Sequence, residues 1–361
     1  MKKSLLELDP QADALLILRS PNLQRVRGPT CQEAAAKKKN VDENSSKKQG
    51  TDTMKAPETN DEMALLRPYL RNGDPNQIEF RVSAKHLCLA SPVFRKMIQG
   101  EFQESKPNSE GLLEICASEW NAEALLIVLD VVHNHHYNVP KRLSEDTIAH
   151  IGLIVDYYDC LEAVQIFFDP WDTGIGGWMG YSFWSYRETE SLAEDFGDDK
   201  TLLLFIAWAF RSKTTFKGLT SSVILNTQGL IETHLPIPTQ LLERINNQRV
   251  EILDQLFSQL YSLQEDLIVG RVGCSLECSC RLLGYLYKQM KEKGLPNIKP
   301  KKPFVGYSVV SLAKTFGSIE TPTWQGLKYW DRCKLKNSLG LYQDEKELGT
   351  AVPGLILESF Q

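Results

Sequence analysis

The sequence lacks the motifs that mark common catalytic sites. Among its 361 residues there is no Gly-x-Ser-x-Gly elbow, no His-Glu-x-x-His pair and no protein-kinase signature. The glycines of Gly174-Ile-Gly-Gly177 follow a predicted helix instead of a strand, and no Gly-Lys-Ser/Thr sequence accompanies them, so we interpret them as a connector. We therefore expect a protein that is not an enzyme, with no catalytic residue and no cofactor.

Long apolar runs and a strong excess of one charge are also missing. The longest apolar run, from Leu202 to Phe210, has nine residues, about half of what a membrane-spanning helix needs. Lys and Arg number 41 against 46 Asp and Glu, a net charge of -5 that disfavours a nucleic-acid-binding surface. Glu7 interrupts the first apolar stretch, so no signal peptide is expected. We expect an intracellular protein without membrane or nucleic-acid partners, and both cytoplasm and nucleus stay open.

Aromatic residues, leucine and isoleucine are absent from Thr30 to Glu62. Lysine clusters alternate there with acids, Ser, Thr and Asn. Such a segment buries too little apolar surface to offset the entropy that ordering would cost. We therefore predict a disordered insert with the outer limits 28 and 77. Ordered structure can resume from Met63 and is expected by Ile78.

The eight cysteines are scattered, as is typical of free thiols in a reducing compartment. Their one cluster is Cys274-x-x-x-Cys278-x-Cys280. A zinc site usually has four ligands, so a fourth would have to come from a distance, for example from Cys333 or His234.

The local geometry of this cluster argues against a metal. If Ser275 caps a helix, Cys278 and Cys280 point about 200° apart on it, too divergent for one ion. Cysteine also packs well as a small apolar residue. We therefore predict core packing and no metal ligand. A metal-dependent regulatory or enzymatic module using Cys274, Cys278 and Cys280 is kept as an alternative.

Two further clusters have ordinary interpretations. His133-Asn-His-His136 ends a predicted helix, where histidines interact favourably with the carbonyl end of the helix dipole, and adjacent histidines point in different directions. Lys299-Pro-Lys-Lys302 has the composition of a nuclear-import signal, but short basic runs next to proline are common in solvated loops. We favour structural roles for both.

The most informative segment extends from Phe80 to Met97. It begins as a strand, with Phe80 and Val82 on one face, and continues with helical spacing. Ser91-Pro92 separates two short helices, because serine is a favoured N-cap and proline at the first helical position loses no hydrogen bond.

This segment resembles the core signature of BTB/POZ domains, Phe-x-Val-His-Lys-x-x-Leu-x-x-x-Ser-Pro-x-Phe. The residues in register with it are Phe80, Val82, Leu87, Ser91, Pro92 and Phe94. Ser83-Ala84 stands where the family has His-Lys, which removes a titratable group and a positive charge, so binding of an acidic partner there is disfavoured. The resemblance implies an α+β protein-binding module.

The resemblance also organises the flanking segments, from about residue 10 to residue 170. It implies a strand near residues 13–18 that pairs with the Phe80 strand, so the insert would lie in the connection between them. A strand at residues 112–116 and three helices follow, with Asn121 and Ser144 as N-caps of the first two. We expect Phe94 to be buried against Leu89, Ile115 and Leu125.

Beyond Pro170 the pattern becomes helical. We predict an apolar helix at residues 199–211, a long helix from residue 240 to about 264 and a helix capped by Ser275 that includes Met290, followed by a less regular tail. The order of these features is similar to filamentous-fungal BTB proteins. Its motifs here are Ala207-Trp-Ala-Phe210, Ile245-Asn-Asn-Gln-Arg249 and Cys274-Ser-Leu-Glu-Cys278.

These patterns predict an α+β N-terminal domain followed by an all-helical domain. The expected ranges are 1–27 for the first strand region, 28–77 for the insert, 78–170 for the domain core, 171–345 for the helical domain and 346–361 for a tail. The expected function is a protein–protein interaction scaffold or adaptor that binds protein partners and forms a weak or conditional homodimer, with partner choice mainly in residues 171–345. A substrate adaptor that binds a cullin of a ubiquitin ligase is the alternative.

Overall fold

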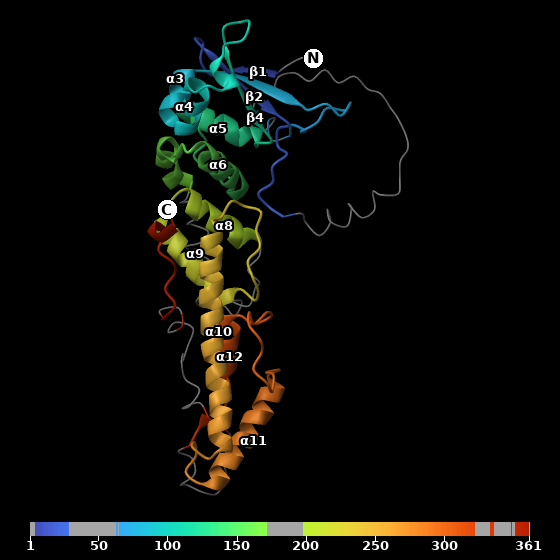
Figure 1. Cartoon of the computed structure of the whole chain (residues 1–361), viewed down its shortest axis with the longest axis vertical. Coiled ribbons are helices and arrows are strands. Elements are labelled where there is room, and N and C mark those ends of the chain that lie inside the picture. Colours follow the sequence, from blue (N-terminus) through green and yellow to red (C-terminus); the bar gives the residue numbers. More distant parts are fainter. Residues whose placement is uncertain are drawn as a thin grey trace. The chain divides into compact units, whose positions relative to one another are not determined.

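A four-stranded mixed sheet forms the centre of the N-terminal unit (Figure 1). Its strands are β1 (Ser4–Glu7), β2 (Ala14–Arg19), β3 (Gln77–Val82) and β4 (Leu113–Ser118), in the order β1-β3-β2-β4. β3 runs antiparallel to β2 and parallel to β1, and β2 runs parallel to β4. The register places Leu16 opposite both Phe80 and Ile115, and all three side chains are fully buried.

The computed structural model describes residues 4–28, 63, 65–171, 198–321, 333–335, 348 and 351–360. The chain divides into two compact units. The first comprises Met1–Ser185 together with Phe205–Phe210 and His234–Pro236, and the second comprises Tyr186–Leu204, Arg211–Thr233 and Ile237–Gln361. The predicted connector at Gly174-Ile-Gly-Gly177 lies outside the described residues.

Short helices follow β3 and longer ones follow β4. The first pair is α3 (Ala84–Ala90) and α4 (Pro92–Gln99), and the 3-10 turn η1 (Gln103–Ser105) comes before β4. Then come α5 (Ala122–Val132), α6 (Glu145–Tyr158) and a helix at residues 161–171. α3 contacts α5, and α4 contacts α6, so the two pairs share one core. The predicted α+β class is confirmed.

Serine and asparagine begin these helices as the sequence predicts. The Asn121 side chain accepts a hydrogen bond from the N–H of Ala124 (2.9 Å) at the start of α5. Ser144 Oγ accepts from the N–H of Thr147 (3.1 Å) at the start of α6. Each bond satisfies one of the N–H groups that the first turn of a helix leaves without an internal partner. For this reason serine and asparagine are favoured at the position where a helix begins.

The connection between β2 and β3 contains the predicted insert. Residues 29–62 and 64, most of that range, lie outside the described residues. Residues 69 and 75 form a β-bridge, and the N–H of Leu70 donates to the Asp74 carbonyl (2.8 Å). The segment at Met63 and Leu66 is held by Asn22, because the Asn22 side-chain amide donates to the carbonyls of Met63 (2.8 Å) and Leu66 (3.0 Å). Within 28–77, the residues just before β3 are thus tied to the first unit.

The second unit is helical in its described residues. Its elements are α9 (Lys213–Asn226), α10 (Thr239–Ile268), α11 (Leu276–Glu292), α12 (Val309–Gly317) and the 3-10 turn η3 (Leu357–Phe360). α8 (Asp198–Ala209) crosses the division between the units, with residues from Phe205 onward grouped with the first. α10 contacts α9, α11 and α12, so this long helix is the centre of the second unit.

A fully buried arginine joins three parts of this unit. Arg249, on α10, donates to the carbonyls of Thr227 (2.8 Å) and Pro303 (3.0 Å). Its Nη2 also donates to the carbonyls of Phe304 (2.9 Å) and Tyr307 (2.8 Å). These carbonyls lie outside helices, so a planar guanidinium satisfies acceptors that would otherwise be buried without donors.

Among the described strands and α-helices, β1, α9 and α12 were not predicted from the sequence. β1 has only four residues and pairs in parallel with a strand more than 70 residues away. α9 and α12 stand where no helix was proposed, and α12 corrects the expectation of an irregular tail after Pro303. The segment at residues 351–360 also packs on the second unit, since Ser221 Oγ donates to the Val352 carbonyl (2.9 Å).

Candidate functional site

The segment from β3 to α4 is built around Ser91. Its Oγ accepts a hydrogen bond from the N–H of Phe94 (3.0 Å) and donates to the carbonyl of Tyr158, at the end of α6. Pro92 occupies the first helical position, as predicted. Ser91 is completely buried, so one hydroxyl both begins α4 and holds this helix to α6.

Phe94 is buried, but its surroundings differ from the sequence-based expectation. Its ring stacks on Tyr158, with centroids 4.1 Å apart and planes inclined by 13°. Leu89 was expected to cover it and instead has 69% of its surface exposed, so that part of the prediction is wrong. The physical reason is helix phase: Leu87 and Cys88 turn α3 toward the core, and Leu89 then points to solvent.

The Ser83-Ala84 pair begins α3 with partners from elsewhere in the unit. The N–H of Ser83 donates to Nε2 of His133 (3.0 Å), and the N–H of Ala84 donates to Oδ1 of Asp13 (2.7 Å). Both Ser83 and Ala84 are buried. The Asp13 carboxylate therefore lies at the positive end of α3, where the helix dipole favours a negative charge.

The histidines after α5 do not converge on a metal site. His133 is buried, its Nδ1 lies 2.8 Å from the Leu129 carbonyl, and its Nε2 accepts from Ser83, so the proton is on Nδ1. Burial lowers its pKa, aided by His86 and His135. His135 contacts Asp130 (3.3 Å), and His136 packs against the Phe167 ring instead. Each of the three histidines therefore has a partner within the first unit.

Lys299 and Lys302 are anchored to α10. Asp254 lies 2.6 Å from Lys299 Nζ and 3.1 Å from Lys302 Nζ, and hydrogen bonds from these two lysines hold the pKa of the Asp254 carboxyl below its usual range. Lys299 also donates to Ser258 Oγ (2.7 Å). Both lysines therefore have partners on α10.

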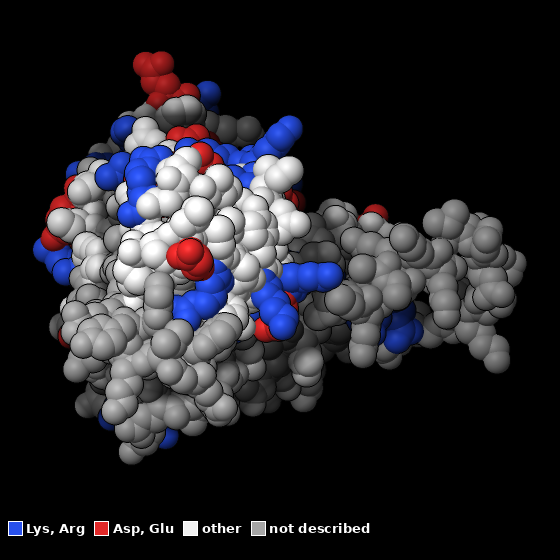
Figure 2. All heavy atoms as spheres, turned by 90° about the horizontal axis from the view of Figure 1, so that it is seen from below, with Lys and Arg blue, Asp and Glu red and all other residues white. Residues whose placement is uncertain are grey.

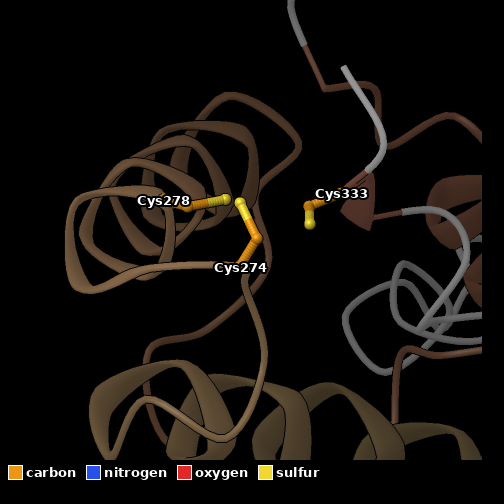
Figure 3. Close-up of side chains that lie close together, drawn as sticks. All are labelled: Cys274, Cys278 and Cys333. Atoms are coloured by element: carbon orange, nitrogen blue, oxygen red, sulfur yellow. The ribbon is translucent and has the colours of Figure 1, made fainter. Parts of the chain in front are cut away.

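A cluster of thiols lies at the start of α11 (Figure 3). The sulfur atoms of Cys274, Cys278 and Cys333 all lie within 4.8 Å of one another. Ser275 begins the helix as predicted, its Oγ accepting from the N–H of Cys278 (3.2 Å), and this cap places Cys274 beside Cys278. Cys280 is exposed and does not belong to the group, in keeping with the divergence expected from helix geometry.

The three thiols influence one another's ionisation. Burial raises the pKa of Cys278, but hydrogen bonds from Cys274 and Cys333 and the charge of Arg281 outweigh it and lower this pKa below its usual value. Burial raises the pKa of Cys333, and so do its neighbours Cys274 and Cys278. His234, the other distant ligand considered from the sequence, belongs to the first unit, where its Nε2 lies 3.1 Å from the Arg25 carbonyl.

The segment around Ser91 belongs to a part of the chain that matches a known family. Residues 71–169 match the BTB/POZ domain family, so the chain contains a BTB/POZ domain, a module that mediates binding between proteins. Comparisons with curated proteins and with solved structures gave no match. The sheet also includes β1 and β2, which lie outside the matched residues, and β2 lies between β3 and β4.

In the part of the chain that the structure describes, no helix is both long and apolar enough to cross a bilayer.

Proposed function

We propose that this protein is a non-catalytic scaffold that self-associates through its BTB domain. The observation that carries this proposal is the exposure of Leu89, which has 69% of its surface in solvent although it lies inside the signature helix α3. Phe102, just before η1, is 58% exposed, and Leu5 on the edge strand β1 is 44% exposed. Apolar side chains of this kind are covered when protein surfaces associate.

The start of α3 supports an apolar mode of association over a charged one. Asp13 and His133 already bind the N–H groups of Ala84 and Ser83, so the buried polar groups there are used within the domain. Interfaces between identical chains depend mainly on burial and shape, and charge contributes less to them.

Co-purification of two tagged forms of the full-length chain tests self-association. Each tag should recover the other form from cells that express both. Leu89→Asp places a charge in the proposed interface and should abolish recovery. Ile166→Asp is the matched control, because Ile166 is also exposed (76%) but lies on the helix at residues 161–171. Equal recovery with the wild type and with Leu89→Asp would contradict this interface.

We further propose that the second unit selects other protein partners. Ile268, Val269 and Leu276 are 51%, 53% and 73% exposed around the junction of α10 and α11. Figure 2 views the molecule from below, and white, uncharged side chains cover much of the described face, with lysine, arginine and a few acidic side chains among and around them. Leu276→Asp should remove captured partners while the two tagged chains still recover each other.

A substrate adaptor of a cullin ubiquitin ligase is the second candidate. Its support is the organisation of the chain, because a BTB domain joined to a separate helical unit provides the two binding surfaces that an adaptor needs. Stoichiometric co-purification of a cullin with the wild-type chain would favour this function. Self-association of the chain without recovery of a cullin would contradict the adaptor function and support the scaffold function.

We also propose that the chain is of the filamentous-fungal BTB type. The three motifs that support this lie at residues 207–210, 245–249 and 274–278. In the second, Arg249 is the buried arginine that binds four carbonyls, and in the third, Ser275 caps α11 between two of the clustered cysteines. Because these contacts stabilise the helices of the second unit, we expect both motifs in relatives that share this arrangement of helices. Relatives that carried the motifs but lacked these contacts would contradict the assignment.

A further inference from the structure

The three sulfur atoms at the start of α11 have the spacing of a soft-metal site. Their separations of at most 4.8 Å compare with about 3.8 Å between two sulfurs that bind one tetrahedral Zn²⁺ with bonds of about 2.3 Å. Shifts of about 1 Å, within reach of rotation about the cysteine side chains, would bring all three into contact with one ion.

The cluster draws its members from two places in the chain. Cys274 and Cys278 flank the cap residue Ser275, whereas Cys333 comes after α12 in the sequence. Figure 3 shows Cys333 on a segment separate from the other two cysteines. A disulfide would join two of these sulfurs and leave the third unused. A metal ion uses all three, and thiolate ligands favour Zn²⁺ over harder cations such as Mg²⁺ or Ca²⁺.

We propose that Cys274, Cys278 and Cys333 bind one Zn²⁺ ion, which ties the start of α11 to the segment that carries Cys333. This departs from the sequence-based expectation, in which Cys280 was the third sulfur and its direction ruled out a common ion. Among the described residues no further Cys, His, Asp or Glu joins the group, so the proposal is for three protein ligands.

Such an ion would have a structural role in the second unit. Cys278 and Cys333 are about 55 residues apart in the sequence, and a metal bridge between such distant positions restricts the unfolded chain. It would also fix the position of the start of α11, where Leu276 is exposed. The site does not depend on self-association through the BTB domain, so either proposal can fail without the other.

Elemental analysis of the full-length chain, purified with a reductant and without chelators, tests the site. The wild type should contain about one zinc per chain. Cys274→Ser, Cys278→Ser and Cys333→Ser should each weaken zinc binding by more than the roughly 10–100-fold typical of losing an outer-shell partner. Cys280→Ser is the matched control and should keep its zinc, because Cys280 lies two residues from Cys278 on the same helix but outside the cluster.

A second measurement uses only the wild-type chain, in case a variant does not fold. Mass spectrometry after brief alkylation should find Cys274 and Cys333 protected in the zinc-loaded protein and modified after a chelator removes the ion, whereas buried Cys278 should stay protected in both states. Exposed Cys116 and Cys280 should be modified equally in both states. Absence of zinc with unchanged labelling of Cys274 and Cys333, or a Cys274–Cys278 disulfide in metal-free protein from cells, would overturn the proposal.

Discussion

The rings of Phe94 and Tyr158 stack nearly parallel, with centroids 4.1 Å apart, and join the signature helix α4 to the end of α6. Both side chains are buried, and the adjacent Ser91 hydroxyl bonds to the Tyr158 carbonyl. The sequence signature therefore describes a contact between segments more than 60 residues apart. The stability of the BTB domain should depend strongly on this contact.

Phe94→Ala should lower the free energy of unfolding of the first unit by about 3–5 kcal/mol, because it removes a buried ring and leaves a cavity against Tyr158. Leu89→Ala, in the neighbouring helix but 69% exposed, should cost less than about 0.5 kcal/mol. Urea unfolding followed by circular dichroism measures both. A Phe94→Ala loss below about 1 kcal/mol would place this ring outside the core.

Ser91→Ala should cost about 2–3 kcal/mol, since it removes a helix cap and also leaves the buried Tyr158 carbonyl without its donor. Ser144→Ala removes a cap and a bond with Thr147 Oγ1 (2.8 Å), both in an exposed position, and should cost about 1 kcal/mol. The comparison in the same urea experiment isolates the contribution of the bond to Tyr158. Equal losses for the two variants would show that this bond adds no stability.

Arg249→Lys should destabilise the second unit by about 3 kcal/mol or more, because a single ammonium group cannot reach the four carbonyls that the guanidinium binds. Arg244→Lys changes an exposed arginine on the same helix and should stay within about 0.5 kcal/mol of the wild type. Thermal unfolding checks the pair. Similar melting temperatures for both variants would rule out the proposed role of Arg249.

His150 should make the first unit less stable in acid. Burial lowers the pKa of this residue on α6 from 6.5 to about 4, with Asp146 opposing in part. Between pH 6.5 and pH 4 the unfolded chain binds a proton at His150 that the folded chain does not. The contribution of His150 to the free energy of unfolding therefore falls as pH drops through this window, by about 3 kcal/mol in total. Above the window this contribution is constant.

His150→Gln does not titrate and should reduce this loss between pH 7 and pH 4.5. His234→Gln changes an exposed histidine of the same unit and is the matched control. Urea midpoints measured across the pH range give the comparison. A wild-type curve that His150→Gln leaves unchanged would show that another group is responsible.

Local signals explain which elements were predictable. The strand at Phe80, the Ser91-Pro92 break and the caps at Asn121, Ser144 and Ser275 are each determined within a few residues, and the structure contains all of them. α9 was missed because Thr, Ser and Gly dilute its helical signal, and it is stabilised by burying Phe216 and Val223.

Long-range pairing accounts for the rest. The parallel partner of β1 is β3, far along the chain. The four residues of β1 contain no local pattern that predicts this pairing. The sequence indicated Cys333 only as one distant candidate beside His234, and it offered Cys280 as the nearer third thiol. The approach of Cys333 to Cys274 and Cys278 depends on how the second unit folds, which spacing alone does not determine.

Light scattering of the full-length protein over a range of concentrations tests self-association through the BTB domain most directly. The measured mass should rise from that of one chain toward that of two as concentration increases. Leu89→Asp should remain at the mass of one chain throughout, and Ile166→Asp should follow the wild type. A wild-type mass that stays at one chain at every concentration, or a Leu89→Asp variant that dimerises like the wild type, would contradict the account.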